Sequence, residues 1–328
     1  MTTMANSTID TDRDFQELAD PYRRELLAHC YRMLGSIHDA EDLVQETYLR
    51  AWRSYGDFEG RSSLRTWLYR IATNVCLTAI DQRGRRPMPT GLGGPSDEPE
   101  RPVVAADEVP WLEPVPDSVL GADAADPATI VAARESTRLA FVAALQHLPA
   151  KQRVVLILRD VLKWRAAEVA ELLDTSTAAV NSALQRARAQ LEQDAPMRDR
   201  LVEPTGPDQR DLLERYAKAF EDADITGLIE LFKKDIIWEM PPFPEWFLGA
   251  ENVVRLIIAQ CAPTPGELRM VPAAANGQPA FGLYRRDENG VHLPYHLQVL
   301  SVTGDGVAHA SVFFDTSLFP LFGLPERL

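Results

Sequence analysis

Hydrophobic residues recur at helical spacing through the first two thirds of the chain and alternate with polar residues near its C-terminal end. The helical spacing predicts a helical hairpin over residues 14–38, two helices between Asp39 and Asp81, and further helices from Pro127 to Leu191. Beyond Gln209 the pattern predicts two short helices, a strand at 236–240, another helix, and strands at 267–275, 280–286, 291–301 and 307–315. This order predicts two all-α domains followed by an α+β domain.

The first helix between Asp39 and Asp81, expected from Ala40 to Tyr55, has two different faces. One face is expected in the core and comprises Ala40, Leu43, Val44, Thr47 and Ala51. The opposite face comprises Asp42, Gln45, Glu46, Leu49 and Trp52. A leucine and a tryptophan on an otherwise polar face are typical of a protein-docking patch. The alternative is that both side chains pack against a neighbouring helix, and periodicity alone leaves both readings open.

The second helix, expected from Ser63 to Asp81, combines a core stripe with a polar and aromatic face. The stripe comprises Leu64, Leu68, Ile71, Ala72, Val75 and Ala79. The other face comprises Thr66, Arg70, Thr73, Asn74 and Leu77, flanked by Arg65, Trp67 and Tyr69. Rings stack on bases, amides pair with base edges and arginines bind phosphate, so this face suits single-stranded nucleic acid. A solvated face with core aromatics is the alternative.

The two helices carry the motif DAEDLVQETYLRAWR followed by F-x-G-x-S-x-L-x-T-W-L-Y-R-I-A-x-N. It resembles the second conserved region of extracytoplasmic-function (ECF) sigma factors, which belong to the sigma-70 family of bacterial RNA polymerase factors. The resemblance implies that residues 14–86 form region 2 and that Asp42, Gln45, Glu46, Leu49 and Trp52 dock on the polymerase β′ subunit. It also implies −10 promoter contacts from Gly60, Arg61, Ser62, Ser63, Arg65, Trp67, Tyr69, Arg70 and Asn74, with an extruded base held by the loop and Asn74.

Residues 87–130 are rich in glycine and proline at their start and contain nine acidic residues and one basic residue. This composition predicts an acidic flexible linker. The linker also contains Val109, Trp111, Leu112 and Val115, which make it more apolar than a plain tether needs. In sigma factors the corresponding linker threads toward the polymerase active-site cleft, and a simple tether is the alternative.

Residues 131–194 contain a helix-turn-helix pattern, with helices expected at Arg165 to Leu173 and Thr177 to Leu191. Val180, Leu184, Ala187 and Leu191 are expected to face inward. The pattern follows LP-x-x-Q-R-x-V-x-x-L and resembles region 4 of the same sigma factors, which reads the −35 element. The residues expected to contact −35 DNA are Thr177, Ala178, Asn181, Ser182, Gln185, Arg186 and Arg188. Ala178 and Ala179 replace the usual polar or basic residues at the start of the recognition helix.

Residues 209–328 resemble the SnoaL-like branch of the NTF2-like cone fold, through A-F-x-x-x-D and W-x-M-P-P-F-P-x-W-x-x-G. Related cyclases and isomerases place an acid with aromatic or histidine partners inside the cone. The candidate pocket residues here are Trp238, Tyr284, His296, His309 and Asp315, with Glu239 as a further candidate acid. The spacing singles out no catalytic pair, so a ligand-binding pocket, a docking domain and an enzyme remain alternatives.

Composition limits the class of protein. The net charge of −14 argues against a protein that coats nucleic acid by bulk electrostatics. Three scattered cysteines, Cys30, Cys76 and Cys261, indicate neither disulfides nor a metal site, and no cofactor motif is present. The longest apolar run, Val154 to Leu158, is too short to span a membrane, and the N-terminal residues do not resemble a signal peptide. We expect a cytoplasmic protein.

The sequence therefore predicts an ECF sigma factor, which is not an enzyme, with a SnoaL-like domain that modulates its activity in cis. Its expected partners are core RNA polymerase, through the β′ and β subunits, and promoter DNA, with a small-molecule ligand or an anti-sigma factor as candidate regulators. The exposed aromatic residues Phe243, Trp246 and Phe247 are expected to mediate that control by docking. Alternatives are a DNA-binding regulator fused to a SnoaL-type isomerase or cyclase, and a dimeric helix-turn-helix repressor.

Overall fold

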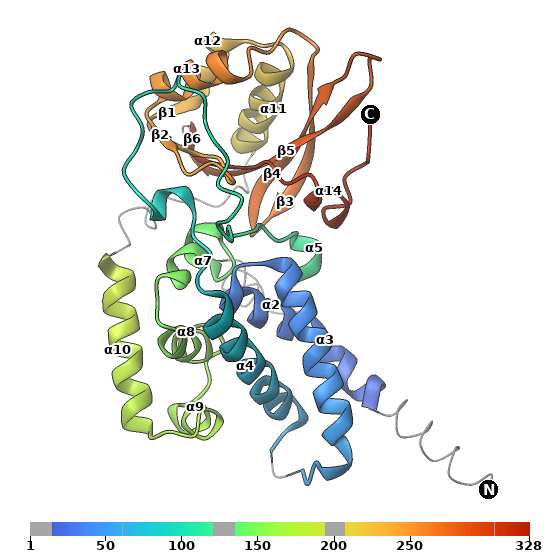
Figure 1. Cartoon of the computed structure of the whole chain (residues 1–328), viewed down its shortest axis with the longest axis vertical. Coiled ribbons are helices and arrows are strands. Elements are labelled where there is room, and N and C mark those ends of the chain that lie inside the picture. The colour runs from blue at the N-terminus through green and yellow to red at the C-terminus, as the bar shows by residue number, and fades with distance from the viewer. Residues whose placement is uncertain (1–14, 61, 121–134, 194–206, 305) are drawn as a thin grey trace, which may run out of the picture. The chain divides into compact units, whose positions relative to one another are not determined.

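The computed structural model describes residues 15–60, 62–120, 135–193, 207–304 and 306–328, which form two compact units (Figure 1). Unit 1 contains Met1–Arg85 and Val119–Pro196, and unit 2 contains Arg86–Ser118 and Met197–Leu328. Each unit is therefore built from two separate stretches of sequence. The segment between the two helical domains belongs to the C-terminal unit.

The first part of unit 1 is helical. It contains η1 (Asp20–Tyr22), α2 (Arg23–Leu34), α3 (Ile37–Ser54), η2 (Tyr55–Asp57) and α4 (Leu64–Arg83). The hydroxyl groups of Ser36 and Ser63 accept the N–H groups of Asp39 and Thr66, so that each serine caps the helix it precedes. The two helices predicted between Asp39 and Asp81 are confirmed within three residues at each end.

The hairpin predicted over residues 14–38 is wrong, because the backbone remains in the right-handed helical region from Ala19 to Arg23. Pro21 lies in a short 3₁₀ turn there, and the chain continues into α2 without reversing. The chain leaves α2 at Gly35, whose φ of 72° is left-handed and suits glycine. The helices that pack together are α2 and α3, which follow one another across Gly35.

The second part of unit 1 contains the helix-turn-helix. Its elements are α5 (Asp117–Leu120), which begins in unit 2, α7 (Leu139–Gln146), α8 (Ala150–Leu156), the π-helical turn η4 (Ile157–Val161), α9 (Ala166–Leu172) and α10 (Thr177–Gln193). Both predicted helices of the motif are confirmed. Val180, Leu184, Ala187 and Leu191 are buried, as the periodicity predicted.

Two buried arginines join the two parts of unit 1. Arg153 on α8 donates to Oε1 and the carbonyl oxygen of Gln146 at 2.7 and 3.1 Å, and to the Met33 carbonyl at the end of α2. Arg32 on α2 donates to the carbonyl oxygen and the hydroxyl of Ser136 at 3.1 and 2.9 Å. Burial lowers the pKa of both guanidinium groups to about 10, so both remain charged at neutral pH. Carbonyl oxygens offset part of the cost of burying these charges.

Unit 2 is an α+β domain. Its helices are α11 (Pro207–Glu221), α12 (Ile225–Leu231), α13 (Ala250–Gln260) and α14 (Leu318–Leu321). Its strands are β1 (Phe232–Glu239), β2 (Trp246–Leu248), β3 (Leu268–Ala275), β4 (Gln278–Arg286), β5 (His292–Thr303) and β6 (Gly306–Phe313). They form one sheet in the order β2-β1-β6-β5-β4-β3, in which only the β1–β6 pair is parallel.

The core of unit 2 lies between α11, α12, α13 and one face of this sheet. Alternate strand positions such as Trp238, Leu283, Leu300 and Ala310 supply the sheet side of the core. The four predicted C-terminal strands and the helices are confirmed, whereas β2 was not predicted and β1 begins four residues before the predicted strand. The predicted fold class, two all-α domains followed by an α+β domain, is confirmed.

The prediction of a flexible linker over residues 87–130 is corrected for its first two thirds. Residues 86–118, which we call the linker segment, form hydrogen bonds with the rest of unit 2. The amides of Ser96 and Ala106 donate to the carbonyl oxygens of Trp246 and Pro242 at 2.8 and 2.9 Å. Leu112 and Val115 are fully buried. Glycine, proline and acidic residues indicate an irregular backbone, and here that backbone obtains its partners from a folded domain. Residues 121–130 lie outside the described residues.

Candidate polymerase and nucleic-acid interface

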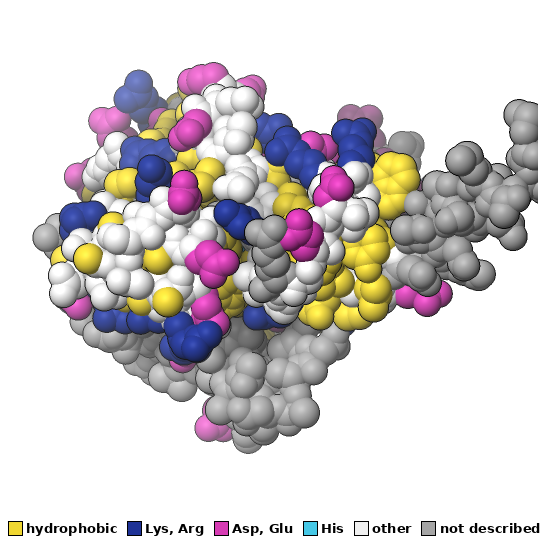
Figure 2. Space-filling view, turned by 90° about the horizontal axis from the view of Figure 1, so that it is seen from below, with side chains coloured by type: hydrophobic (Ala, Val, Ile, Leu, Met, Phe, Trp, Pro, Cys, Tyr) yellow, Lys and Arg dark blue, Asp and Glu magenta, His cyan; other side chains and the backbone are white. Residues whose placement is uncertain are grey.

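The predicted docking face of α3 is on the surface of unit 1. Leu49 and Trp52 are 48% and 45% exposed, and Asp42 and Gln45 are also exposed. Glu46 is half-buried and pairs with Arg50 one turn later at 2.6 Å. Figure 2 looks at the end of unit 1 that carries the loop between α3 and α4, where hydrophobic surface lies beside charged side chains. The geometry offers Leu49 and Trp52 as apolar contacts inside a polar rim.

The residues predicted to contact the −10 element lie partly on the surface. Arg70 and Asn74 are exposed one turn apart on α4, and Gly60 is exposed with a φ of 68°. Trp67 is half-buried, with its ring centroid 4.8 Å from that of Phe58. Among the loop serines, Ser62 is half-buried and Ser63 is exposed but serves as the N-cap of α4. Arg61 lies outside the described residues.

Two residues of this face are interior, which corrects their predicted position. Tyr69 is fully buried, with ring centroids 5.1 Å from His29 and 5.3 Å from Trp164. Thr73 is fully buried and forms a 3.0 Å hydrogen bond with His29. The physical reason is that α4 packs against helices of both parts of unit 1, so its buried arc is wider than one stripe. Tyr69 is therefore a core residue rather than a surface for bases.

Arg65, also predicted at the −10 site, is engaged within unit 1. Its guanidinium contacts both carboxylate oxygens of Glu25 at 2.8 to 3.0 Å and lies over the Tyr69 ring, 5.0 Å from the centroid. Burial lowers the pKa of the neighbouring His29 to about 3, so this ring is neutral. Arg65 thus covers a neutral aromatic cluster and keeps a partly exposed charge.

The residues predicted to contact the −35 element all lie on the exposed face of α10. They are Thr177, Ala178, Asn181, Ser182, Gln185, Arg186 and Arg188. Arg188 is held by Asp160 through two contacts of 2.8 and 2.6 Å. Arg186 has no hydrogen bond or ion pair with any residue that the structure describes. The outer face combines small residues with one unpaired guanidinium, which suits close approach to a major groove.

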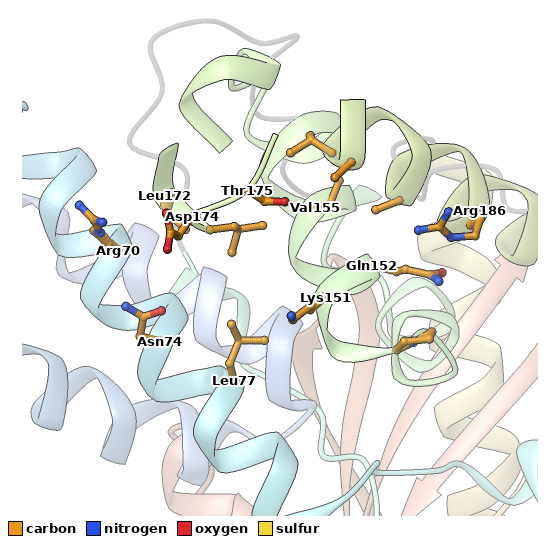
Figure 3. A pocket seen from close by; sticks show the side chains of 15 residues that line it. Arg70, Asn74, Leu77, Lys151, Gln152, Val155, Leu172, Asp174, Thr175 and Arg186 are labelled. Carbon is orange, nitrogen blue, oxygen red and sulfur yellow. The ribbon is translucent and has the colours of Figure 1, made fainter. Parts of the chain in front are cut away.

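One cavity in unit 1 brings residues of the −10 and −35 sets together. It has a volume of about 470 Å³ and is lined by Arg70 and Asn74 from α4, Lys151 and Gln152 from α8, and Arg186 from α10 (Figure 3). Lys151 and Gln152 could not be predicted as members of this set, because only tertiary packing places α8 beside both α4 and α10.

The five candidate pocket residues of the C-terminal domain do not converge, which corrects that prediction. Trp238 belongs to the helix-covered core, and His296 pairs with Leu283 of the same core. Tyr284 lies next in sequence to Leu283, beyond a bulge, and its hydroxyl donates to the Pro325 carbonyl at 2.7 Å. Trp238 and His296 therefore lie on the core face of the sheet, whereas Tyr284 lies on the opposite face.

His309 and Asp315 complete that correction. His309 is adjacent to the core residue Ala310 and therefore lies on the face opposite to Trp238. Asp315 is exposed and accepts the amide and hydroxyl of Ser317 at 2.9 and 2.6 Å. On the core side, Tyr216 donates to Gln298 at 2.8 Å, and burial lowers the pKa of His296 to about 3.

Glu239 forms a separate buried cluster on the face away from the core. Its Oε1 contacts His309 at 2.7 Å and accepts the Ser311 hydroxyl at 3.0 Å. Its Oε2 accepts the Thr90 amide of the linker segment at 3.2 Å. Burial alone raises the pKa of Glu239, but the interactions with His309 and Thr90 lower it overall. The carboxylate is therefore ionised and has partners at both oxygens.

Family models match both helical parts of unit 1. Residues 18–86 match Sigma-70 region 2, and residues 138–191 match Sigma-70, region 4. The chain is 59% identical over 317 residues to the ECF RNA polymerase sigma factor SigG of Mycobacterium tuberculosis, covering 96% of this chain and 85% of SigG. It is 30% identical to SigJ of the same organism, over 72% of this chain and 70% of SigJ. The crystal structure of SigJ aligns with a TM-score of 0.61 and 25% identity, over 95% of this chain and 99% of that one.

The chain belongs to the ECF RNA polymerase sigma factors. As such it binds core RNA polymerase and promoter DNA and directs promoter-specific initiation. The similarity to SigJ identifies its C-terminal unit as an NTF2-like, SnoaL-type domain. Both family resemblances found in the sequence are confirmed. Within the described residues, no helix combines the length and the hydrophobicity needed to cross a membrane.

Proposed function

We propose that the C-terminal domain of this sigma factor controls initiation by holding the linker segment between the two DNA-binding domains. The observation that carries the proposal is the exchange of hydrogen bonds between Val115 and Asn276. The Val115 amide donates to Asn276 Oδ1 at 2.9 Å, and the Asn276 amide donates to the Val115 carbonyl at 2.9 Å. A segment held in this way cannot also enter a polymerase cleft.

Contacts along the whole linker segment support this role. The Asp117 carboxylate accepts the Gly277 amide at 2.7 Å, and the Trp246 indole donates to the Gly93 carbonyl at 2.8 Å. Arg255 on α13 pairs with both carboxylate oxygens of Glu100 at 2.7 and 2.9 Å. Acidic residues of the segment thus have partners on the domain. The exposed pairs contribute less than the buried backbone hydrogen bonds.

The aromatic loop serves this attachment rather than an open docking surface, which corrects the expectation for Phe243, Trp246 and Phe247. Phe247 is 1% exposed, and Phe243 lies 5.3 Å from the Phe314 ring, centroid to centroid. Trp246 is half-buried and contacts the linker segment through its indole and its carbonyl oxygen. These aromatic side chains therefore make their contacts within unit 2.

For the helical unit we propose the roles that the family resemblance implies. Leu49 and Trp52, with Asp42, Gln45 and Glu46, contact the core polymerase. The exposed residues Gly60, Ser63, Arg70 and Asn74 and the half-buried residues Ser62 and Trp67 contact the −10 element, with Arg65 at the edge of this surface. Thr177, Ala178, Asn181, Ser182, Gln185, Arg186 and Arg188 contact the −35 element. The full or partial exposure of these side chains supports the assignment.

We further propose that the C-terminal domain has no catalytic activity and that the protein acts in the cytoplasm, where RNA polymerase lies. The Glu239 carboxylate already has partners at both oxygens, one of them from the linker segment. A general base needs an oxygen within reach of substrate. The engaged carboxylate and the separation of the candidate residues favour a holding role over acid–base chemistry.

Promoter-dependent transcription with purified core polymerase tests the proposal. Replacing Asn276, whose φ of 57° is left-handed, by glycine removes its side-chain acceptor and retains the backbone conformation. Asn276→Gly is expected to raise initiation, because the linker segment is released more often. Asn289→Gly, in the turn between β4 and β5, is the matched control. Equal activity of the Asn276→Gly variant and the intact chain would contradict the proposal.

A further inference from the structure

The cavity of unit 1 has the size of a small-molecule site. Its volume of about 470 Å³ lies within the range of about 300 to 1,000 Å³ that such sites occupy. Side chains from α4, α8, α9 and α10 surround it, with Arg70 and Arg186 at opposite ends (Figure 3). The cavity exists only while these helices are close together, an arrangement that we call the closed unit.

The lining of the cavity is positively charged. The charged residues of the lining are three cations, Arg70, Lys151 and Arg186, and one carboxylate, Asp174. No hydrogen bond or ion pair connects any of the three cations to another residue in the described part of the chain. Other arginines of unit 1 are paired, such as Arg65 with Glu25 and Arg188 with Asp160. Three unpaired cations around a cavity with a single carboxylate favour an anionic ligand.

The rest of the lining is aliphatic and weakly polar. Leu77, Val155, Leu172, Leu173 and Val180 provide apolar wall. Asn74, Gln152 and Thr175 provide hydrogen-bonding groups, and the lining contains no aromatic side chain. A nucleobase therefore finds no stacking partner here, whereas an aliphatic chain finds matching surface. We propose that the cavity binds a small amphiphilic anion, with its charged group at Lys151, which lies between the two arginines, and its aliphatic part against the leucines and valines.

Such a ligand would stabilise the closed unit and oppose promoter binding, a consequence that rests on the proposed DNA contacts of Arg70, Asn74 and Arg186. The −10 and −35 elements are separated by about 25 base pairs, or roughly 85 Å along duplex DNA. Residues that line one cavity cannot contact two elements that far apart at once. Because the ligand binds only the closed unit, it has the differential affinity that a population shift requires.

Isothermal titration of the full-length protein tests the site, with hexyl phosphate as the probe. Inorganic phosphate and hexanol supply the charged and the aliphatic part separately. Hexyl phosphate is expected to bind at one site and at least tenfold more tightly than either part. Lys151→Gln is expected to weaken binding about tenfold, which corresponds to about 1.4 kcal/mol. Lys163→Gln removes an exposed lysine outside the cavity and is expected to leave the affinity unchanged.

Two results would overturn the site. One is the absence of hexyl phosphate binding to the intact protein, and the other is an equal affinity of the Lys151→Gln and Lys163→Gln variants. Lys151 has no proposed DNA contact, so its effect on titration is independent of the promoter assignments. A Lys151→Gln variant that loses the probe, together with an Arg186→Ala variant that retains −35 binding, would uphold the site and refute the DNA contact.

Discussion

Tyr69 and Asn74 are on the same helix, α4, yet Tyr69 is fully buried between His29 and Trp164 whereas Asn74 is exposed. Both residues match the motif of sigma factors that capture −10 DNA. The structure separates them into a residue that supports the helix from inside and a surface residue, which we propose contacts −10 DNA. This difference gives opposite expectations for their substitution.

Replacing Tyr69 by alanine is expected to destabilise unit 1 by about 3 to 5 kcal/mol, because it leaves a cavity beside two aromatic rings. Replacing Asn74 by alanine is expected to change stability by less than about 0.5 kcal/mol and to weaken −10 binding by the holoenzyme. Chemical unfolding and fluorescence anisotropy with −10 DNA measure the two effects. A Tyr69→Ala variant that is as stable as the intact protein but binds −10 DNA more weakly would show that Tyr69 contacts the DNA.

The exposed apolar residues on α3 give a prediction for polymerase binding. Leu49→Asp and Trp52→Asp are each expected to reduce binding to core polymerase at least tenfold, because a charge replaces an apolar contact. Leu18→Asp is the matched control, since Leu18 is 51% exposed on another part of unit 1. Pull-down with core polymerase and circular dichroism test binding and folding together. Equal retention of all three variants would rule out this face as the docking surface.

Two neighbouring arginines of α10 are expected to behave differently. Arg186→Ala is expected to weaken −35 binding by about 1 to 3 kcal/mol and to relax base preference at one position. Arg188→Ala is expected to have a smaller effect, because Arg188 is already held by Asp160. Holoenzyme binding to −35 variants at a fixed salt concentration measures both. If Arg186→Ala weakens binding equally for all −35 sequences, Arg186 contacts a phosphate rather than a base.

Buried His29 predicts a fall in stability at acidic pH. Its pKa is about 3 in the folded protein and 6.5 in the unfolded chain, so the unfolded state binds the extra proton. The stability that His29 contributes is complete above pH 6.5 and is lost progressively as the pH falls from 6.5 toward 3. At pH 5.5 the expected loss is about 1.4 kcal/mol relative to neutral pH.

Urea unfolding at pH 7.5 and 5.5 measures this loss, and His29→Gln provides the comparison. Glutamine retains a hydrogen-bonding group near Thr73 and has no proton to gain. The loss of stability between the two pH values is therefore expected to shrink by about 1.4 kcal/mol in His29→Gln. The same pH dependence in both proteins would show that His29 does not cause it.

The sequence predicted the helices and strands well because periodic burial and local capping determine them. Ser63 caps α4 and Gly35 ends α2, and both signals are local. Tyr69 was misplaced because a second packing partner, Trp164, is almost one hundred residues away in sequence. A hydrophobic stripe along one side of a helix predicts one buried face, and it does not show that a second face is also covered.

The predictions for the linker segment and for the pocket residues of the C-terminal domain were wrong for a related reason. Glycine, proline and acidic residues predicted flexibility, but Val115 forms its hydrogen bonds with Asn276 in the turn between β3 and β4. In the sheet, the bulge between Leu283 and Tyr284 and the alternation of strand faces decide which side chains meet. Chemical type alone grouped Trp238 with His309, although the sheet separates them.

Amide hydrogen exchange of the full-length protein tests most directly whether the C-terminal domain holds the linker segment. The amides of Ser96, Ala106 and Val115 donate to residues of that domain, so they are expected to be protected in the free protein. The protection of Val115 is expected to fall in Asn276→Gly, and the protection of all three is expected to fall when core polymerase binds. Exchange of these amides at the rate of an unstructured chain in the free protein would contradict the account.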